Sequence, residues 1–227
     1  RVCGKNKLHS YTHRGYKTMR VLVACEWSGT VRKAFRNKGH DAWSCDILSA
    51  LGGSPYHIKG DVLDILDEGW DLMIAHPPCN HLAVSGALHF HKKLDQQKAA
   101  LEFVQKLLDA PIKHICLENP VSIISSHIRK PDDIIQPYNF GHDASKTTCL
   151  WLKNLPKLER TKYIPPRIVE RDGKKYKRWA NQTDSGQNAL GPSKNRSKLR
   201  AITYEGIAEA MASQYPSFIE VFNEIHP

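Results

Sequence analysis

A short apolar run that ends in two prolines limits the folds open to this chain. Leu72 to Ala75 are apolar without alternation, as in a parallel strand buried on both faces. Pro77 and Pro78 lack the N–H that a central ladder needs, so the strand must end before them. Ligands bind at the carboxyl edge of open α/β sheets, so the run predicts that Cys79 is presented there. For a lone cysteine, the alternative is a small hydrophobe at a strand end.

Strands and helices alternate on either side of this run. The predicted strands are 20–25, 41–45, 56–59, 72–75 and 114–117, with 134–136 and 148–152 as candidates for the last two. The predicted helices are 30–38, 62–66 and 96–108, with a last one around 207–211. This alternation is typical of a doubly wound, mostly parallel α/β sheet of the Rossmann-like class.

Positive charge is concentrated in two segments. Residues 1–20 hold six Lys/Arg and no acid, and 157–200 hold thirteen Lys/Arg and four acids, so at a net charge of +10 the remainder is acidic. This polarity favours nucleic acid on one face, although basic segments also serve solubility. The expected organisation is a basic, flexible extension over 1–18, an α/β domain over 19–156, a loop-dominated basic insert over 157–200, and a returning C-terminal helix over 201–227.

Length, hydropathy and cysteine spacing narrow the class of protein. The 227 residues suffice for one well-buried core with a small addition. No apolar run reaches the roughly 18 residues of a membrane span, and the N-terminus lacks a signal peptide's apolar core. The six cysteines show no C-x-x-C spacing, which predicts reduced thiols and neither disulfides nor a cysteine zinc site. We expect a cytoplasmic monomer.

The turn after the first strand, together with acids at the next two strand ends, suggests a nucleotide-like ligand. Ser28-Gly29 opens a helix, and Asp46 closes the second strand about 20 residues on, where ribose hydroxyls would bind. Glu26 and Trp27 stand where a phosphate-binding loop has glycine, which disfavours a pyrophosphate. S-adenosylmethionine fits, since it has a sulfonium, an ammonium group and no phosphate. Asp61 would accept from its adenine amino group, although each acid alone is also explained as a helix cap or solvated turn residue.

A thiol and a carboxyl are predicted at adjacent strand ends. Cys79 follows one strand and Glu118-Asn119-Pro120 closes the next, so both can reach one substrate. A thiolate that adds to an electron-poor ring, while a carboxyl protonates a ring nitrogen, combines covalent and general acid catalysis. On cytosine, Cys79 would attack C6 and Glu118 would protonate N3, which prepares C5 to accept a methyl group. The acid must carry a proton, so a raised pKa is expected for Glu118. The alternative for this segment is a strand-exit turn that caps the next helix.

These segments resemble the DNA cytosine-5 methyltransferase family, especially its short phage-type members, over about residues 19–215. The matching elements are Val21 to Gly29, Asp46, Gly60-Asp61-Val62, Pro77-Pro78-Cys79, Glu118-Asn119-Pro120, and a terminal helix after a variable insert. The resemblance implies a class I S-adenosylmethionine-dependent methyltransferase acting on double-stranded DNA in a bacterial host cell. It implies Cys79 as the nucleophile and Glu118 as the acid, with Asn119 beside it. The implied cofactor contacts are Cys25, Glu26, Trp27, Ser28, Gly29, Asp46, Ile47, Asp61, Val62 and Pro77.

The insert stands where the family keeps its target-recognition region, and its shortness predicts a short recognition sequence or weak selectivity. The target base must be flipped out of the duplex, so basic residues would hold the flanking phosphates and Trp179 or Tyr176 would stack or fill the vacated space. The family's arginine pair near Gln136 is missing, which leaves Lys146 or Arg196 to contact cytosine O2. The candidate DNA-binding residues are Lys146, Arg167, Arg171, Lys174, Lys175, Lys177, Arg178 and Arg196.

Four alternatives remain. An RNA cytosine-5 methyltransferase would use the same thiol and carboxyl. Amino-directed DNA methyltransferases have Asp, Asn or Ser before Pro-Pro and an aromatic residue after it, where this chain has His76 and Cys79. A non-catalytic nucleic-acid-binding protein on this scaffold would need neither Cys79 nor Glu118. The histidines near Cys79 suggest a metal site, but they match no common zinc spacing: His76, His81, His89 and His91.

Overall fold

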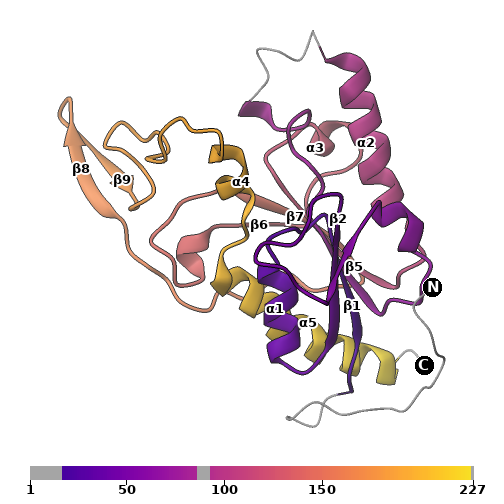
Figure 1. Cartoon of the computed structure of the whole chain (residues 1–227). Helices are drawn as coiled ribbons and strands as arrows, with labels where there is room; N and C mark the ends of the chain where they lie inside the picture. The colour runs from indigo at the N-terminus through magenta and orange to yellow at the C-terminus, as the bar shows by residue number, and fades with distance from the viewer. Residues whose placement is uncertain (1–16, 86–92, 226–227) are drawn as a thin grey trace.

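A seven-stranded, mostly parallel sheet forms the centre of the molecule (Figure 1). The computed structural model describes residues 17–85 and 93–225, so most of the predicted N-terminal extension lies outside the described residues. The strands are β1 (Arg20–Ala24), β2 (Asp41–Asp46), β3 (His57–Lys59), β4 (Leu72–Ala75), β5 (His114–Pro120), β6 (Asp133–Ile135) and β7 (Thr148–Lys153). Their order is β3-β2-β1-β4-β5-β7-β6, and β7 alone runs in the direction opposite to the other six strands.

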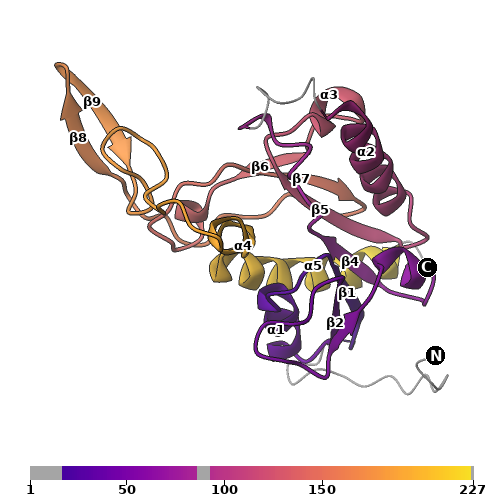
Figure 2. The same ribbon diagram turned by 45° about the horizontal axis from the view of Figure 1, so that its top comes forward.

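Helices cover both faces of the sheet (Figures 1 and 2). One face is covered by α1 (Thr30–Asn37) and α5 (Glu205–Ile225), and the other by α2 (Leu94–Leu108), α3 (Ile124–His127) and the 3-10 turn η1 (Val62–Ile65). The doubly wound α/β class predicted from the sequence is therefore confirmed. No helix among the described residues is long and apolar enough to cross a membrane.

The alternating side chains of the central strands fill two separate cores. Val21 and Val23 of β1 pack with α1 and α5, whereas Leu22 and Ala24 pack with the helices of the other face. All four side chains are fully buried, as are those of β4. A strand covered on both faces needs apolar residues at every position, which is why these runs do not alternate.

Strand β5 is longer than the sequence pattern predicted. Glu118, Asn119 and Pro120 do not leave the sheet but continue β5, because they pair with Leu150, Cys149 and Thr148 of the antiparallel strand β7. Glu118 therefore sits within a strand and does not cap a following helix.

The basic insert contains a hairpin that the sequence analysis did not predict. Strands β8 (Arg167–Arg171) and β9 (Lys174–Arg178) pair antiparallel, and Figure 2 shows them projecting away from the main sheet. Asp172 and Gly173 join them with φ angles of 52° and 69°. Two successive left-handed residues match the strand twist, which explains the Asp-Gly pair. The insert also contains the short helix α4 (Arg196–Ala201), and the 3-10 turn η3 (Pro137–Asn139) lies before β7.

Candidate active site

The turn between β1 and α1 is built around a buried carboxylate. Glu26 is 4% exposed, and its two oxygens accept hydrogen bonds from Val31 N at 2.6 Å and Arg32 N at 3.2 Å. Glu26 therefore caps the first turn of α1 and uses N–H groups that could otherwise hold a phosphate. Burial raises the pKa of Glu26, although the nearby His76 and these N–H bonds oppose the shift.

Gly29 and Arg32 fix the shape of this turn. Gly29 has a φ of 73°, and a Cβ there would collide with the Arg32 guanidinium. Arg32 is 2% exposed and donates to Ser44 Oγ on β2 at 2.8 Å. No sequence signal identified this buried arginine, because Arg on a short surface helix is normally solvated. Of the remaining turn residues, Ser28 is buried, and Trp27 is half-buried with Lys198 of α4 6.0 Å from its ring centroid.

Three predicted cofactor residues meet at the carboxyl ends of β1, β2 and β3. Burial raises the pKa of the Cys25 thiol, and the charges of Asp46 and Asp61 raise it further, so both acids lie near this residue. Asp46 accepts from Leu48 N at 2.8 Å, and Asp61 caps η1 through Leu63 N at 3.0 Å. Each uses only Oδ1, which leaves Oδ2 without a hydrogen bond within the described chain. Two further predicted contacts differ in exposure: Ile47 is 74% exposed and Val62 is buried.

The loop that carries Cys79 is tied to β5 and to the segment after it. Asn119 Nδ2 on β5 donates to Pro77 O at 2.9 Å. Cys79 O accepts from Leu82 N and Ala83 N at 3.0 and 2.9 Å, which forms a turn. Pro77 is buried and Cys79 is half-buried. The thiol is therefore held close to the sheet edge, as the Pro-Pro-Cys pattern predicted.

Glu118 is hydrogen-bonded to a residue that the sequence reasoning left without a catalytic role. Its Oε2 lies 2.9 Å from His76 Nδ1, and Glu118 is 8% exposed. Burial opposes ionisation, but the His76 bond and the charge of Lys146 prevail, and the pKa of Glu118 lies below its ordinary value. The raised pKa expected for Glu118 is therefore wrong, because two partners stabilise the carboxylate.

Cys79, Glu118 and two cations influence one another. Burial and the charge of Glu118 raise the pKa of the Cys79 thiol, whereas Lys146 and Arg200 oppose the shift. Lys146 Nζ donates to Arg200 O at 3.0 Å, which brings the end of α4 to this edge of the sheet. Lys146 was predicted to lie here, but Arg200 was missed. Arg196 begins α4, and its Nε is buried without a hydrogen bond from the described residues.

Several polar atoms near the thiol and the carboxyl have no hydrogen-bond partner. Four of the seven such buried atoms among the described residues belong to the segments that carry Cys79 and Glu118: His76 Nε2, His81 Nδ1, Asn119 Oδ1 and Ser122 Oγ. Buried polar atoms in folded proteins are nearly always paired, and exceptions gather where ligands or water bind. These four atoms remain available to a ligand or to water at this sheet edge.

The predicted DNA-binding residues of the hairpin fall into two groups. Arg167 donates to Gln182 O at 2.8 Å, and Arg178 donates to Asp184 O at 3.1 Å, so both hold the hairpin to the following loop. Arg171 forms an ion pair with the adjacent Asp172 at 3.4 Å. The remaining residues are exposed and have no ion pair within the described ranges: Lys174, Lys175 and Lys177.

One aromatic residue suggested for base contact is occupied elsewhere. Trp179 is 8% exposed, stacks on Tyr138 with ring centroids 4.0 Å apart, and donates to Ile164 O at 3.0 Å. Trp179 therefore packs the insert against η3, and its buried ring is not exposed for the base stacking that the sequence analysis suggested. Tyr176 is half-buried on β9, with the Arg178 guanidinium 5.1 Å from its ring centroid.

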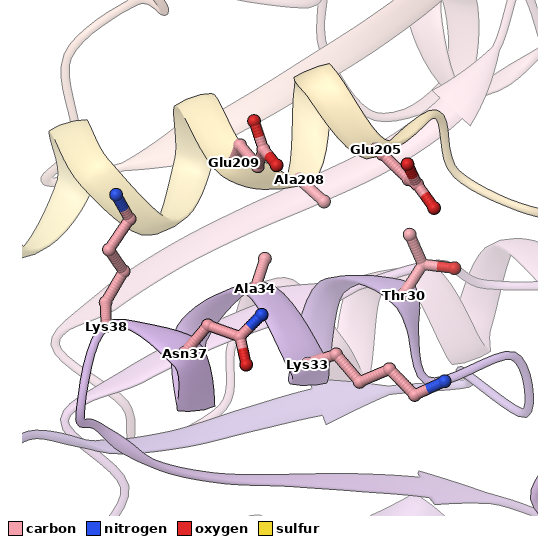
Figure 3. A pocket seen from close by; sticks show the side chains of 8 residues that line it. All are labelled: Thr30, Lys33, Ala34, Asn37, Lys38, Glu205, Ala208 and Glu209. Carbon is pink, nitrogen blue, oxygen red and sulfur yellow. The ribbon is translucent and has the colours of Figure 1, made fainter.

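Neither a metal centre among the described histidines near Cys79 nor a groove on one face of the sheet adds to this site. Within residues 17–85 and 93–225, no group of three His, Cys, Asp or Glu side chains is placed to hold a metal ion, while His89 and His91 of the metal alternative lie outside these ranges. A groove of about 590 Å³ lies between α1 and α5, where Ala34 and Ala208 point toward each other (Figure 3). The groove contains none of the predicted site residues. Its lining is Thr30, Lys33, Ala34, Asn37, Lys38, Glu205, Ala208 and Glu209.

Comparisons with known proteins give distant structural matches only. No protein-family model and no curated protein sequence matches the chain. An Entamoeba histolytica methyltransferase superposes with a TM-score of 0.45 at 15% identity, covering 69% of this chain and 61% of its own. A candidate DNA modification methyltransferase encoded within an E. coli prophage superposes with a TM-score of 0.42 at 14% identity, covering 60% and 46%. This chain thus spans less than two thirds of either protein.

The charges around Cys79 predict opposite changes in thiol reactivity. Glu118→Gln removes a negative charge, so more thiolate forms and alkylation at pH 8 should speed up by about two- to tenfold. Lys146→Met should slow alkylation by a similar factor. Iodoacetamide labelling followed by peptide mass spectrometry at Cys79 measures both rates. Lys153→Met is the matched control, because Lys153 Nζ also donates to a backbone carbonyl, at the far end of β7. Equal rates in all variants would contradict this arrangement.

Proposed function

We propose that this protein transfers a methyl group from S-adenosylmethionine to C5 of cytosine in DNA. The observation that supports the proposal is the shared location of Cys79, in the loop after β4, and Glu118, on the adjacent strand β5, a thiol and a carboxyl whose charges act on each other. Binding alone requires neither group, whereas addition to a pyrimidine ring requires both.

Cys79 and Glu118 would act on two different atoms of the cytosine ring. Cys79 Sγ adds to C6 as Glu118 delivers a proton to N3, and the electron pair of the C5–C6 double bond makes C5 nucleophilic. After C5 takes the methyl group and S-adenosylhomocysteine leaves, the C5 proton passes to water. The C5–H electron pair re-forms the double bond, the Sγ–C6 bond breaks to return the thiolate, and the N3 proton returns to Glu118. Lys146 and Arg200 favour the thiolate that starts the sequence, because their charges oppose the rise in the Cys79 pKa.

The residues at the ends of β1 to β3 suit a phosphate-free nucleoside ligand. Glu26 occupies the N–H groups at the start of α1, so a pyrophosphate would meet a carboxylate and no free donors. Asp46 and Asp61 each retain one oxygen for a ligand hydroxyl or amino group. We propose that these two acids hold S-adenosylmethionine together with residues of the turn and with the exposed Ile47. The cofactor would supply the methyl group on a sulfonium.

DNA is the proposed substrate because of where the free positive charge lies. The hairpin that carries the exposed lysines projects beyond the sheet (Figure 2), and the charge of Arg200 on α4 acts on Cys79. Such an arrangement can hold phosphates on either side of a flipped base. Arg167 and Arg178 would instead keep the hairpin in place.

The proposal predicts a defined product. Duplex DNA incubated with the protein and S-adenosylmethionine should yield 5-methylcytosine, identified by mass spectrometry of the nucleosides after digestion. Cys79→Ala should abolish the product, and Glu118→Gln should lower kcat by about 100-fold or more. Cys79→Ser should lose activity yet retain duplex binding. N-methylated nucleosides, methylation of RNA alone, or binding without transfer by the parent protein would each contradict the proposal in favour of one alternative.

The hairpin lysines predict a salt-dependent loss of DNA affinity. Changing Lys174, Lys175 and Lys177 together to Gln should weaken binding and reduce the slope of log K against log salt by roughly 0.9 for each phosphate that the variant no longer neutralises. Fluorescence anisotropy across a salt series measures both. The control replaces three exposed lysines of α1 and α2 and removes the same charge: Lys33, Lys98 and Lys106. If both triple variants behave alike, net charge and not the hairpin determines binding.

A further inference from the structure

His76 makes a buried contact with Glu118 but has no step in the proposed methyl transfer. His76 is the first residue after β4, and its backbone N–H donates to Ala24 O at 2.9 Å, so it extends the ladder by one residue. Its Nδ1 lies 2.9 Å from Glu118 Oε2, and each side chain is 10% exposed. The pair is therefore shielded from water, where a hydrogen bond is strong and specific.

The partners of His76 determine which atom carries the shared hydrogen. An ionised carboxyl has no hydrogen to give, so Nδ1 must be the donor to Glu118. Nε2 is buried without a hydrogen bond from the described residues. The Nδ1–H group is therefore what holds Oε2 of Glu118.

The bond leaves the two oxygens of Glu118 in different situations. Oε2 is held by His76, and the structure gives Oε1 no hydrogen-bond partner within the described chain. A planar carboxyl held at one oxygen keeps a fixed orientation, so Oε1 is the oxygen that remains for a substrate atom.

We propose that His76 is a positioning residue for Glu118: it holds Oε2 and so leaves Oε1 oriented toward pyrimidine N3. This inference rests on the function proposed above, in which Glu118 is the acid. Because the same bond stabilises the carboxylate, His76 also determines the pH range in which Glu118 carries its proton. Other titratable groups also act on this pair. They are Glu26 in the turn after β1, Cys79 in the loop after β4, Cys116 on β5, Lys146 in the loop before β7, and Cys149 on β7.

Two substitutions separate the hydrogen bond from the space that the ring fills. His76→Leu keeps a side chain of similar size but removes the N–H donor, whereas His76→Asn keeps an N–H donor near the Nδ1 position. His114→Asn is the control. His114 is a buried histidine at the other end of β5, its Nδ1 also bonds an oxygen, that of Asn154, at 2.7 Å, and its Nε2 is also unpaired.

The kinetic measurement is the pH profile of methyl transfer. Activity should fall at high pH as Glu118 loses its proton, and in His76→Leu this fall should move to higher pH by about one pH unit or more. The kcat should drop by about tenfold or more with little change in KM. A carboxyl without a fixed orientation stabilises the transition state less, whereas substrate binding changes little. His76→Asn should recover part of both, and His114→Asn should match the parent protein.

A second measurement does not depend on activity. Titration of the Glu118 carboxyl by carbon-13 NMR, assigned by its loss in Glu118→Gln, should show the same upward movement in His76→Leu and none in His114→Asn. A folded His76→Leu variant in which neither the titration nor the pH profile moves would overturn the role of His76, as would equal shifts in His114→Asn. If the parent protein transfers no methyl group, the proposed function fails, whatever the titration shows.

Discussion

Strands β4 and β5 lie side by side in a parallel register that pairs Ala75 with Leu117. The next residue on each strand is His76 and Glu118, so this register brings the imidazole to the carboxyl across 42 positions of sequence. A shift of one residue would turn every side chain of one strand to the opposite face and separate the pair. The register itself is set by apolar residues that fill a core on each side.

Antiparallel pairing fixes the other side of the same carboxyl. Strand β7 lies opposite Glu118 at Leu150, and the loop just before β7 supplies Lys146. Asn119 meanwhile anchors the Cys79 loop through Pro77 O. The thiol, the carboxyl and their nearest charges are thus carried by a rigid sheet and short tethers, which suits groups that must meet one ring in a fixed geometry.

Local sequence patterns were enough to predict the positions of the main-sheet strands and the edge at which the candidate site lies. The apolar run before Pro77 marked β4, and the acids after β2 and β3 marked the neighbouring strand ends. The patterns did not predict that β5 continues through Pro120, because that extension depends on pairing with β7. The hairpin was missed although Asp172-Gly173 is a strong turn signal, since the charged residues around it obscured the strand pattern.

Side-chain contacts between distant segments explain the remaining differences. Trp179 is recognisable as an aromatic residue in a basic insert, but only the fold shows that it stacks on Tyr138. The same holds for Glu118, whose pKa was expected to be raised. Its pKa is lowered because His76 and Lys146, from two other segments, stabilise the charge. Any proton that Glu118 gives to a substrate must therefore be acquired against that stabilisation, of which the His76 hydrogen bond is the largest part.

The most direct test of this account is the intact mass of the protein after incubation with S-adenosylmethionine and duplexes of varied sequence that contain 5-fluorocytosine. Fluorine at C5 blocks release of the thiol after methyl transfer, so the account predicts a stable protein–DNA adduct. The adduct should require the cofactor and should be absent from Cys79→Ala. A parent protein that binds S-adenosylmethionine and forms no adduct with any duplex, or an adduct that persists in Cys79→Ala, would contradict it.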